Sequence, residues 1–200
     1  MKSGPRPFTS HVKMMVLTMT LPHAGRWFYQ RELQMLTSIA YTPVRAALLD
    51  LEAFGLLKKR THGNRQYYMV DKDFFLYDEY KRIVLKTVGL GDHLRYRRKN
   101  PEDILVAFIH GDFADGRETT ESPIDVCVVG KMSKQKFDEA LAAARMFTLK
   151  EYRPLVLRPD EFASRCRKKE PELLKILAGR KMFMVGRPED LDRLMANGKA

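Results

Sequence analysis

The chain has 200 residues, 44% of them hydrophobic, which is enough for one large domain or for two domains of roughly 100 residues with separate cores. This composition argues against intrinsic disorder. The formal net charge is +11, and residues 1–100 hold 18 Lys and Arg against 8 Asp and Glu, so that this half carries +10 and the other half +1. Such an asymmetric charge is typical of a protein that binds the phosphate backbone of nucleic acid, although basic membrane-surface proteins share it.

The cysteines and the hydropathy of the chain indicate the cellular compartment in which the protein is expected. Cys127 and Cys166 are too few for a disulfide framework and lack the spacing of a zinc site, so we expect a reducing compartment and a cytoplasmic protein. The apolar run 14–21 is short and is followed by no small-residue cleavage site, so we expect no secretory leader. No run approaches the roughly 18 apolar residues of a membrane span, so we expect no membrane partner.

The first half begins with three expected helices and a short strand. Residues 10–21 start with a capping serine, are apolar at helical spacing and end before a proline. A short aromatic strand is expected at 26–29 and a second helix at 30–40. Thr42-Pro43 predicts the start of a third helix, with Thr42 as its cap and Pro43 in its first position, and this helix should end near Gly55.

Residues 58–100 are expected to form a hairpin followed by a linking segment. Two short strands flank Gly63-Asn64, which favours a tight turn with basic residues at the hairpin tip (Lys58, Lys59, Arg60 and Arg65). A linking helix should follow and close at Gly89, and the basic run 95–99 should be a connector. The connector is equally consistent with phosphate contacts and with a solvated joint.

The order of these elements is that of a winged helix-turn-helix, and the phrase LLDLEAFGLLKKRTHGNRQYYMV resembles bacterial transcriptional regulators of the arsenic-repressor and multiple-antibiotic-resistance type. The resemblance covers about residues 10–70. It implies double-stranded DNA as partner, with the third helix in the major groove and the hairpin at phosphates or the minor groove. The residues it places at the DNA are Arg31, Tyr41, Thr42, Pro43 and Arg45 on the helices and Arg60, His62, Asn64 and Arg65 on the hairpin.

Each of these roles has a simpler alternative. Arg31 and Arg45 are also explained as solvated helix-surface residues, and the hairpin cations as charges that protect an exposed strand edge. Trp27, Tyr67 and Tyr68 are interpreted as core and strand packing. In regulators of this type the linking helix often forms a twofold interface, so a homodimer is expected, but the same helix is explained equally well as cover for its own core.

The second half alternates strands and helices. Strands are expected at 104–111, 124–130, 153–157 and 181–185, and helices at 133–149, from Pro159 and from about Pro188. This pattern predicts an α/β domain with functional residues at the strand ends.

The segment HGDFADGRETTESPIDVCVVG resembles the signature of the minimal nucleotidyltransferase superfamily. In that signature Gly-Ser cradles a triphosphate, and Asp-x-Asp on the next strand binds Mg²⁺ because alternate residues of a strand share a face. Here Gly111 is kept, but Asp112 replaces the serine, Asp125 is the one carboxylate left of the pair, and the strand at 153–157 holds no acid. The motif is therefore degenerate: no catalytic residue and no cofactor are expected, and any metal site would rest on Asp112 and Asp125, helped by Glu151 or Asp115.

We therefore expect an α+β protein with a winged helix-turn-helix domain at 1–72, a linking helix and basic connector at 73–100, and a nucleotidyltransferase-like α/β domain at 101–200. The expected function is a DNA-binding transcriptional regulator whose second domain is a pseudoenzyme serving as sensor or interaction surface, with a nucleotide or a protein as effector. One alternative is an active nucleotidyltransferase that uses Mg²⁺ and nucleotide to modify a protein, an RNA or a small molecule, with the winged helix recognising the substrate. Another is a protein-interaction module of antitoxin type.

Overall fold

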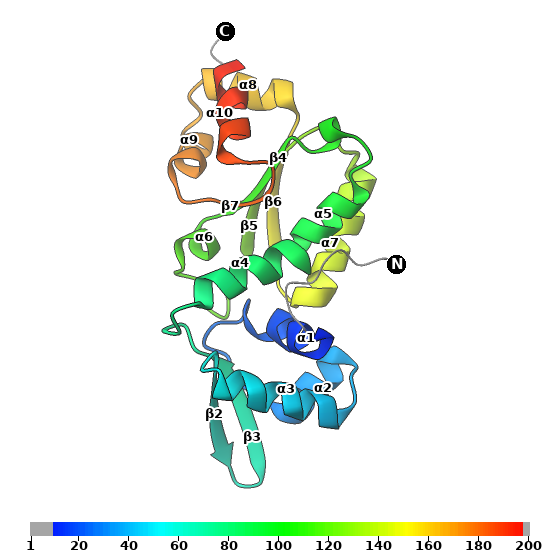
Figure 1. Cartoon of the computed structure of the whole chain (residues 1–200). Coiled ribbons are helices and arrows are strands. Elements are labelled where there is room, and N and C mark those ends of the chain that lie inside the picture. The colour runs from blue at the N-terminus through cyan, green and yellow to red at the C-terminus, as the bar shows by residue number, and fades with distance from the viewer. Residues whose placement is uncertain (1–9, 198–200) are drawn as a thin grey trace. The chain divides into compact units, whose positions relative to one another are not determined.

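The computed structural model describes residues 10–197, which form an α+β structure with two separate sheets (Figure 1). The chain divides into two compact units between Thr87 and Val88, and the short loop Thr119–Glu121 belongs with the first. We call these the N-terminal unit and the C-terminal unit. None of the helices described combines the length and the apolar character that crossing a bilayer requires.

From Ser10 onward, where its description begins, the N-terminal unit contains four helices and a three-stranded sheet. The α1 helix begins after Ser10, whose Oγ accepts a hydrogen bond from the backbone N–H of Lys13, as the sequence predicts. The elements of the N-terminal unit in chain order are α1 (His11–Thr20), β1 (Phe28–Tyr29), α2 (Gln30–Thr37), α3 (Tyr41–Ala53), β2 (Leu57–His62), β3 (Arg65–Val70) and α4 (Tyr77–Thr87).

The sheet of this unit is antiparallel, in the order β1-β3-β2. Phe28 pairs with Tyr68, and both rings are buried, together with Leu33 of α2 and Leu48 of α3. Because successive side chains of a strand point to opposite faces, Tyr29, Tyr67 and their neighbours in register lie on the other face of the sheet. The N-terminal unit therefore has one sheet face in its core and one turned outward.

Two details of this unit differ from the sequence-based expectation. The α3 helix begins at Tyr41, two residues before the expected Pro43, so Ala40 occupies the cap position and Thr42 and Pro43 lie inside the first turn. Proline is accepted there because the first backbone N–H groups of a helix have no partner within it. In the hairpin, Lys58 and Lys59 pair with Met69 and Tyr68 near its base, so the prediction that they form the tip is wrong.

The linking segment also differs from the expectation of one helix and a connector. It holds two helices, because α5 (Leu90–Arg97) forms where the basic connector was expected. The α4 helix packs with the N-terminal unit and α5 with the C-terminal unit. Leu90 and Leu94 are buried on one side of α5, whereas Arg95 is exposed, so the run is an amphipathic helix that hydrophobic spacing could have revealed.

The C-terminal unit is built on a mixed four-stranded sheet in the order β6-β5-β4-β7. Figure 1 shows α5 and α7 on one side of this sheet and α8, α9 and α10 on the other, where Phe162, Leu173 and Leu191 pack against the strands. Besides α5, its elements are η1 (Pro101–Asp103), β4 (Val106–His110), α6 (Asp112–Asp115), β5 (Ile124–Val129), α7 (Lys134–Thr148), β6 (Tyr152–Leu157), α8 (Pro159–Arg167), α9 (Pro171–Ala178), β7 (Met182–Val185) and α10 (Pro188–Asn197).

The strand directions of this sheet decide which residues meet at its edge. Because β4 and β5 are antiparallel, His110 at the end of β4 pairs with Asp125 at the start of β5. Because β5 and β6 are parallel, Asp125 is also in register with Arg153 at the start of β6. Residues from three strands that are far apart in the sequence are thus brought together at one edge.

Candidate functional site

The first candidate surface is the exposed side of α2 and α3. Val44 and Leu48 turn toward the core, whereas the opposite side of α3 is exposed. This division follows helical periodicity, because residues three and four apart share a face. The exposed residues include every helix position that the sequence analysis assigned to DNA: Arg31, Tyr41, Thr42, Pro43 and Arg45.

The second part of this surface is the hairpin formed by β2 and β3, which extends away from the helices of the N-terminal unit (Figure 1). His62 pairs with Arg65 across the turn, and Gly63 has φ +56°, a left-handed conformation that a tight hairpin turn requires. All four hairpin residues that the sequence analysis assigned to DNA are exposed: Arg60, His62, Asn64 and Arg65.

The basic residues of the N-terminal unit are of two kinds. Some form ion pairs: Lys58 Nζ lies 2.7 Å from Asp71 Oδ1, and Lys59 Nζ lies 2.9 Å from Glu52 Oε2. These side-chain hydrogen bonds raise the pKa of both lysines. Lys58 and Lys59 are therefore charges already neutralised by neighbouring acids.

The arginines assigned to DNA have a different environment. Within the described part of the chain, no acidic side chain forms a salt bridge with any of them (Arg31, Arg45, Arg60 and Arg65). Their positive charge therefore stays available to an anionic ligand. Sequence reasoning could not separate these arginines from the paired lysines, because the separation depends on which acids the fold brings near.

Aromatic rings contact the hairpin arginines, which the sequence analysis did not foresee. The Arg60 guanidinium carbon lies 4.3 Å from the centroid of the Trp27 ring and 5.5 Å from that of Tyr67. The Arg65 guanidinium carbon lies 5.7 Å from the Tyr29 ring. Tyr68 is buried, as expected, but Trp27 and Tyr67 are partly exposed on the outward sheet face and are not core residues.

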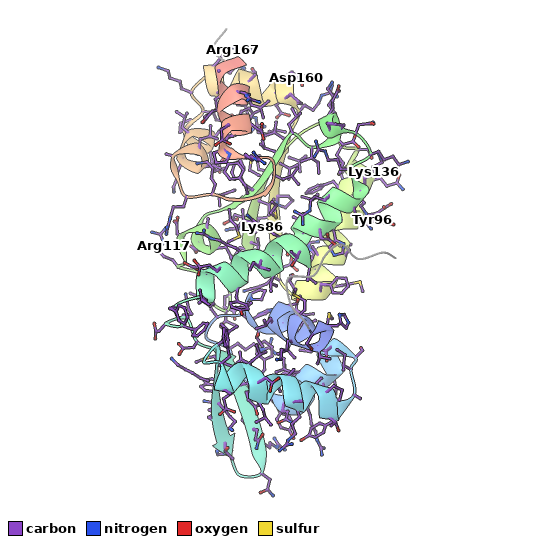
Figure 2. The ribbon with its side chains drawn as sticks, in the orientation of Figure 1. Lys86, Tyr96, Arg117, Lys136, Asp160 and Arg167 are labelled. Atoms are coloured by element: carbon purple, nitrogen blue, oxygen red, sulfur yellow. The ribbon has the colours of Figure 1, made fainter. Side chains whose placement is uncertain are left out.

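The C-terminal unit holds the second candidate site, the sheet-edge site (His110, Gly111, Asp112, Asp125 and Arg153). These residues line a cavity of about 710 Å³ together with Asp115 at the end of α6, Arg117 shortly after it, further residues of β6, and Glu172 and Lys175 from α9. The α9 helix was not expected from the sequence, so its contribution to the cavity was missed. Figure 2 labels Arg117 at the surface of this unit.

The site is held together by one bidentate ion pair. Arg153 Nε donates to Asp125 Oδ1 at 2.7 Å, and Arg153 Nη2 donates to Asp125 Oδ2 at 3.0 Å. The adjacent Gly111 has φ +66° and ψ −149°, a conformation that favours glycine, and a Cβ there would lie 2.9 Å from Asp125 Oδ2. Gly111 thus lets the backbone approach the Asp125 carboxylate closely.

These residues do not fit the magnesium site that the nucleotidyltransferase resemblance implies. Mg²⁺ prefers several oxygen ligands in octahedral order, but both oxygens of Asp125 accept hydrogen bonds from a guanidinium. Arg153 pairs with Asp125 across β5 and β6, so a positive charge occupies a position where a second carboxylate could have bound the cation. Among residues 10–197, no three His, Cys, Asp or Glu side chains gather in a metal-binding arrangement.

The two residues expected to assist Asp112 and Asp125 have other partners. Glu151 Oε2 lies 3.2 Å from Arg145, so the prediction that Glu151 helps the site is not supported by its position. Asp115 accepts a hydrogen bond from Arg117 at 2.6 Å, and Arg117 also lies 4.0 Å from Asp112. The site therefore has arginine counter-charges where the resemblance implies a metal ion.

His110 adds a titratable group to the sheet-edge site. Burial lowers the pKa of His110 below its usual value, and the attraction of Asp125 offsets part of this effect. The imidazole is therefore neutral near pH 7 and can accept or donate one hydrogen bond in the cavity.

Comparisons of this chain with protein-family models, with curated proteins and with solved structures find no match, so its interpretation rests on its own residues and geometry.

Proposed function

We propose that this chain is a cytoplasmic, sequence-specific DNA-binding transcriptional regulator with an N-terminal winged helix-turn-helix. In this proposal α3 lies in the major groove, with Tyr41, Thr42, Pro43 and Arg45 near base edges. The β2–β3 hairpin is the wing and contacts flanking phosphates or the minor groove. The element order of the N-terminal unit supports the proposal.

The observation that carries the proposal is the distribution of paired and unpaired charge on the N-terminal unit. The basic residues that a winged helix would direct to DNA are exposed and have no acidic partner among the described residues, whereas nearby Lys58 and Lys59 are neutralised. Binding to phosphate gains from the release of counterions, and only cations free of acidic partners can contribute fully.

For the C-terminal unit we propose a nucleotidyltransferase-like fold without transferase activity, serving as a sensor or interaction domain. The cavity beside His110 is large enough for a small-molecule effector. The Arg153–Asp125 ion pair supports the loss of metal-dependent chemistry. A nucleotide or a protein is the proposed effector, and a homodimer through α4 is the proposed assembly, since a dimer doubles the DNA contact area.

The experiment that tests the proposed function is a competition between genomic fragments and random duplex at increasing salt. A regulator should retain a subset of fragments at physiological salt, because base contacts add to the electrostatic attraction. Equal binding to every duplex that disappears with salt would contradict sequence-specific regulation.

The second candidate function is an active nucleotidyltransferase, which the cavity beside Gly111 and Asp125 favours. It would transfer nucleotide to a protein, an RNA or a small molecule. The test is transfer of labelled nucleotide with Mg²⁺ or Mn²⁺, with Asp125→Ala as control. Transfer by the wild type that is abolished in the variant would establish this function and exclude the pseudoenzyme.

A further inference from the structure

The outward face of the N-terminal sheet carries a row of side chains in register. Arg60 of β2 pairs with Tyr67 of β3, and Tyr67 pairs with Tyr29 of β1. The Tyr29 and Tyr67 rings lie 5.6 Å apart between centroids. Trp27 precedes β1, and its ring is the nearest one to Arg60. Arg60 is therefore in contact with two aromatic rings that come from different parts of the chain.

These rings hold Arg60 without cancelling its charge. An acidic partner would occupy the guanidinium N–H groups, as Glu52 occupies the amine of the adjacent Lys59. A ring beneath the guanidinium attracts the cation through its face and leaves the N–H groups at the guanidinium edge free. Arg60 is thus restrained in position while its positive charge stays exposed and without an acidic partner among the described residues.

We infer that Trp27 and Tyr67 are positioning residues that orient Arg60 for a phosphate oxygen of the nucleic-acid backbone, an inference that rests on the proposed function. A phosphate fits this geometry, because the donors of a ring-covered guanidinium lie at its edge and match paired oxygens, and the wing of a winged helix lies beside flanking phosphates. Arg65 above Tyr29 repeats the arrangement nearer the hairpin tip.

The effect of holding Arg60 in place before binding can be measured as a change in duplex affinity. Immobilising one flexible side chain at an interface costs about 0.5–1.5 kcal/mol, which corresponds to about 2- to 12-fold in affinity. If the rings remove this cost before binding, Trp27→Leu should weaken duplex binding by a factor in that range. The effect should depend on Arg60, because the ring acts through the guanidinium.

The first test needs no DNA, because Trp27 is the single tryptophan of the chain and its fluorescence reports on the surroundings of this one ring. Arg60→Ala should uncover the indole and raise the rate at which acrylamide quenches it. Lys58→Ala, which removes a charge from the same strand, should leave quenching unchanged. Equal quenching of the wild type and Arg60→Ala would overturn the inferred contact, whatever the protein binds.

The second test is a double-mutant cycle of Trp27→Leu and Arg60→Ala, with duplex affinity as the readout. We expect Trp27→Leu to weaken binding in the wild type and to have little effect once Arg60 is absent. Trp27→Phe keeps an aromatic face and disturbs folding less than Trp27→Leu does. It should retain most of the wild-type duplex affinity, and that affinity should still fall when Arg60 is replaced.

The outcomes separate the inference from the proposed function. Additive effects in folded variants, with a wild type that binds duplex, would overturn the positioning role and leave the regulator intact. A wild type that binds no duplex would overturn the regulator and the phosphate role together, while the quenching experiment would still decide whether the rings hold Arg60.

Discussion

The combined variant Arg60→Ala and Arg65→Ala should reduce the salt dependence of duplex binding. Removing one phosphate contact lowers the slope of log affinity against log salt by about 0.9, so removing two lowers it by about 1.8 per protomer. Over a fourfold rise in salt, the affinity of the wild type should therefore fall by about 12-fold more than that of the variant. In a homodimer the slope difference should double.

The matched control is Lys58→Ala combined with Lys59→Ala, which removes the same formal charge from the same hairpin. These lysines are paired with Asp71 and Glu52, so they contribute no phosphate contact in this account. The control should leave the slope nearly unchanged, because the slope counts the phosphates contacted.

The assay is fluorescence anisotropy of a labelled duplex titrated at several salt concentrations, with thermal unfolding to verify that each variant is folded. The four substituted residues are exposed or held at the surface, and we expect each variant to stay within about 1 kcal/mol of wild-type stability per residue changed. An unchanged slope in the arginine variant, or an equal reduction of slope in the lysine control, would show that Arg60 and Arg65 do not make the proposed phosphate contacts.

Four further predictions concern stability and the sheet-edge site. Gly111→Ala should cost about 1–3 kcal/mol in denaturant unfolding, because alanine is strained at φ +66° and its Cβ would crowd Asp125; an unchanged midpoint would contradict the geometry. Leu48→Ala should cost about 2–5 kcal/mol, because Leu48 is fully buried. Burial lowers the pKa of both His93 and His110, so the unfolded chain binds more protons than the folded chain, and the free energy of unfolding should fall as the pH drops below about 6.5. His110→Gln should reduce this loss. A free energy of unfolding that rises toward pH 5 would contradict the role of these histidines. Mg²⁺ and Mn²⁺ should leave the thermal midpoint of the wild type unchanged, whereas a saturable rise would reveal a metal site.

Much of the local structure was predictable because short-range rules governed it. Ser10 caps α1, and the hairpin turns at Gly63-Asn64, as the sequence predicts. The strands β4 and β5 followed from continuous apolar runs. By contrast, α3 starts two residues earlier than predicted because a proline is accepted anywhere in a first turn, so Thr42-Pro43 could not fix the boundary.

The parts that sequence reasoning missed depend on contacts between distant segments. Arg60 meets Trp27 because β1 and β2 flank the same central strand, and Arg153 meets Asp125 because β5 and β6 run parallel. Neither partner could be identified from residue spacing along the chain. The sequence did identify the exposed cations, but the fold decides which of them carry an unneutralised charge.

The most direct test of the central claim is hydrogen exchange of the full chain with and without duplex. If α3 and the hairpin bind DNA, exchange should slow at the start of α3, over Tyr41–Arg45, and along the β2–β3 hairpin, with the strands of the C-terminal sheet unchanged. Protection confined to the C-terminal unit, with α3 and the hairpin unaffected by saturating duplex, would contradict the account.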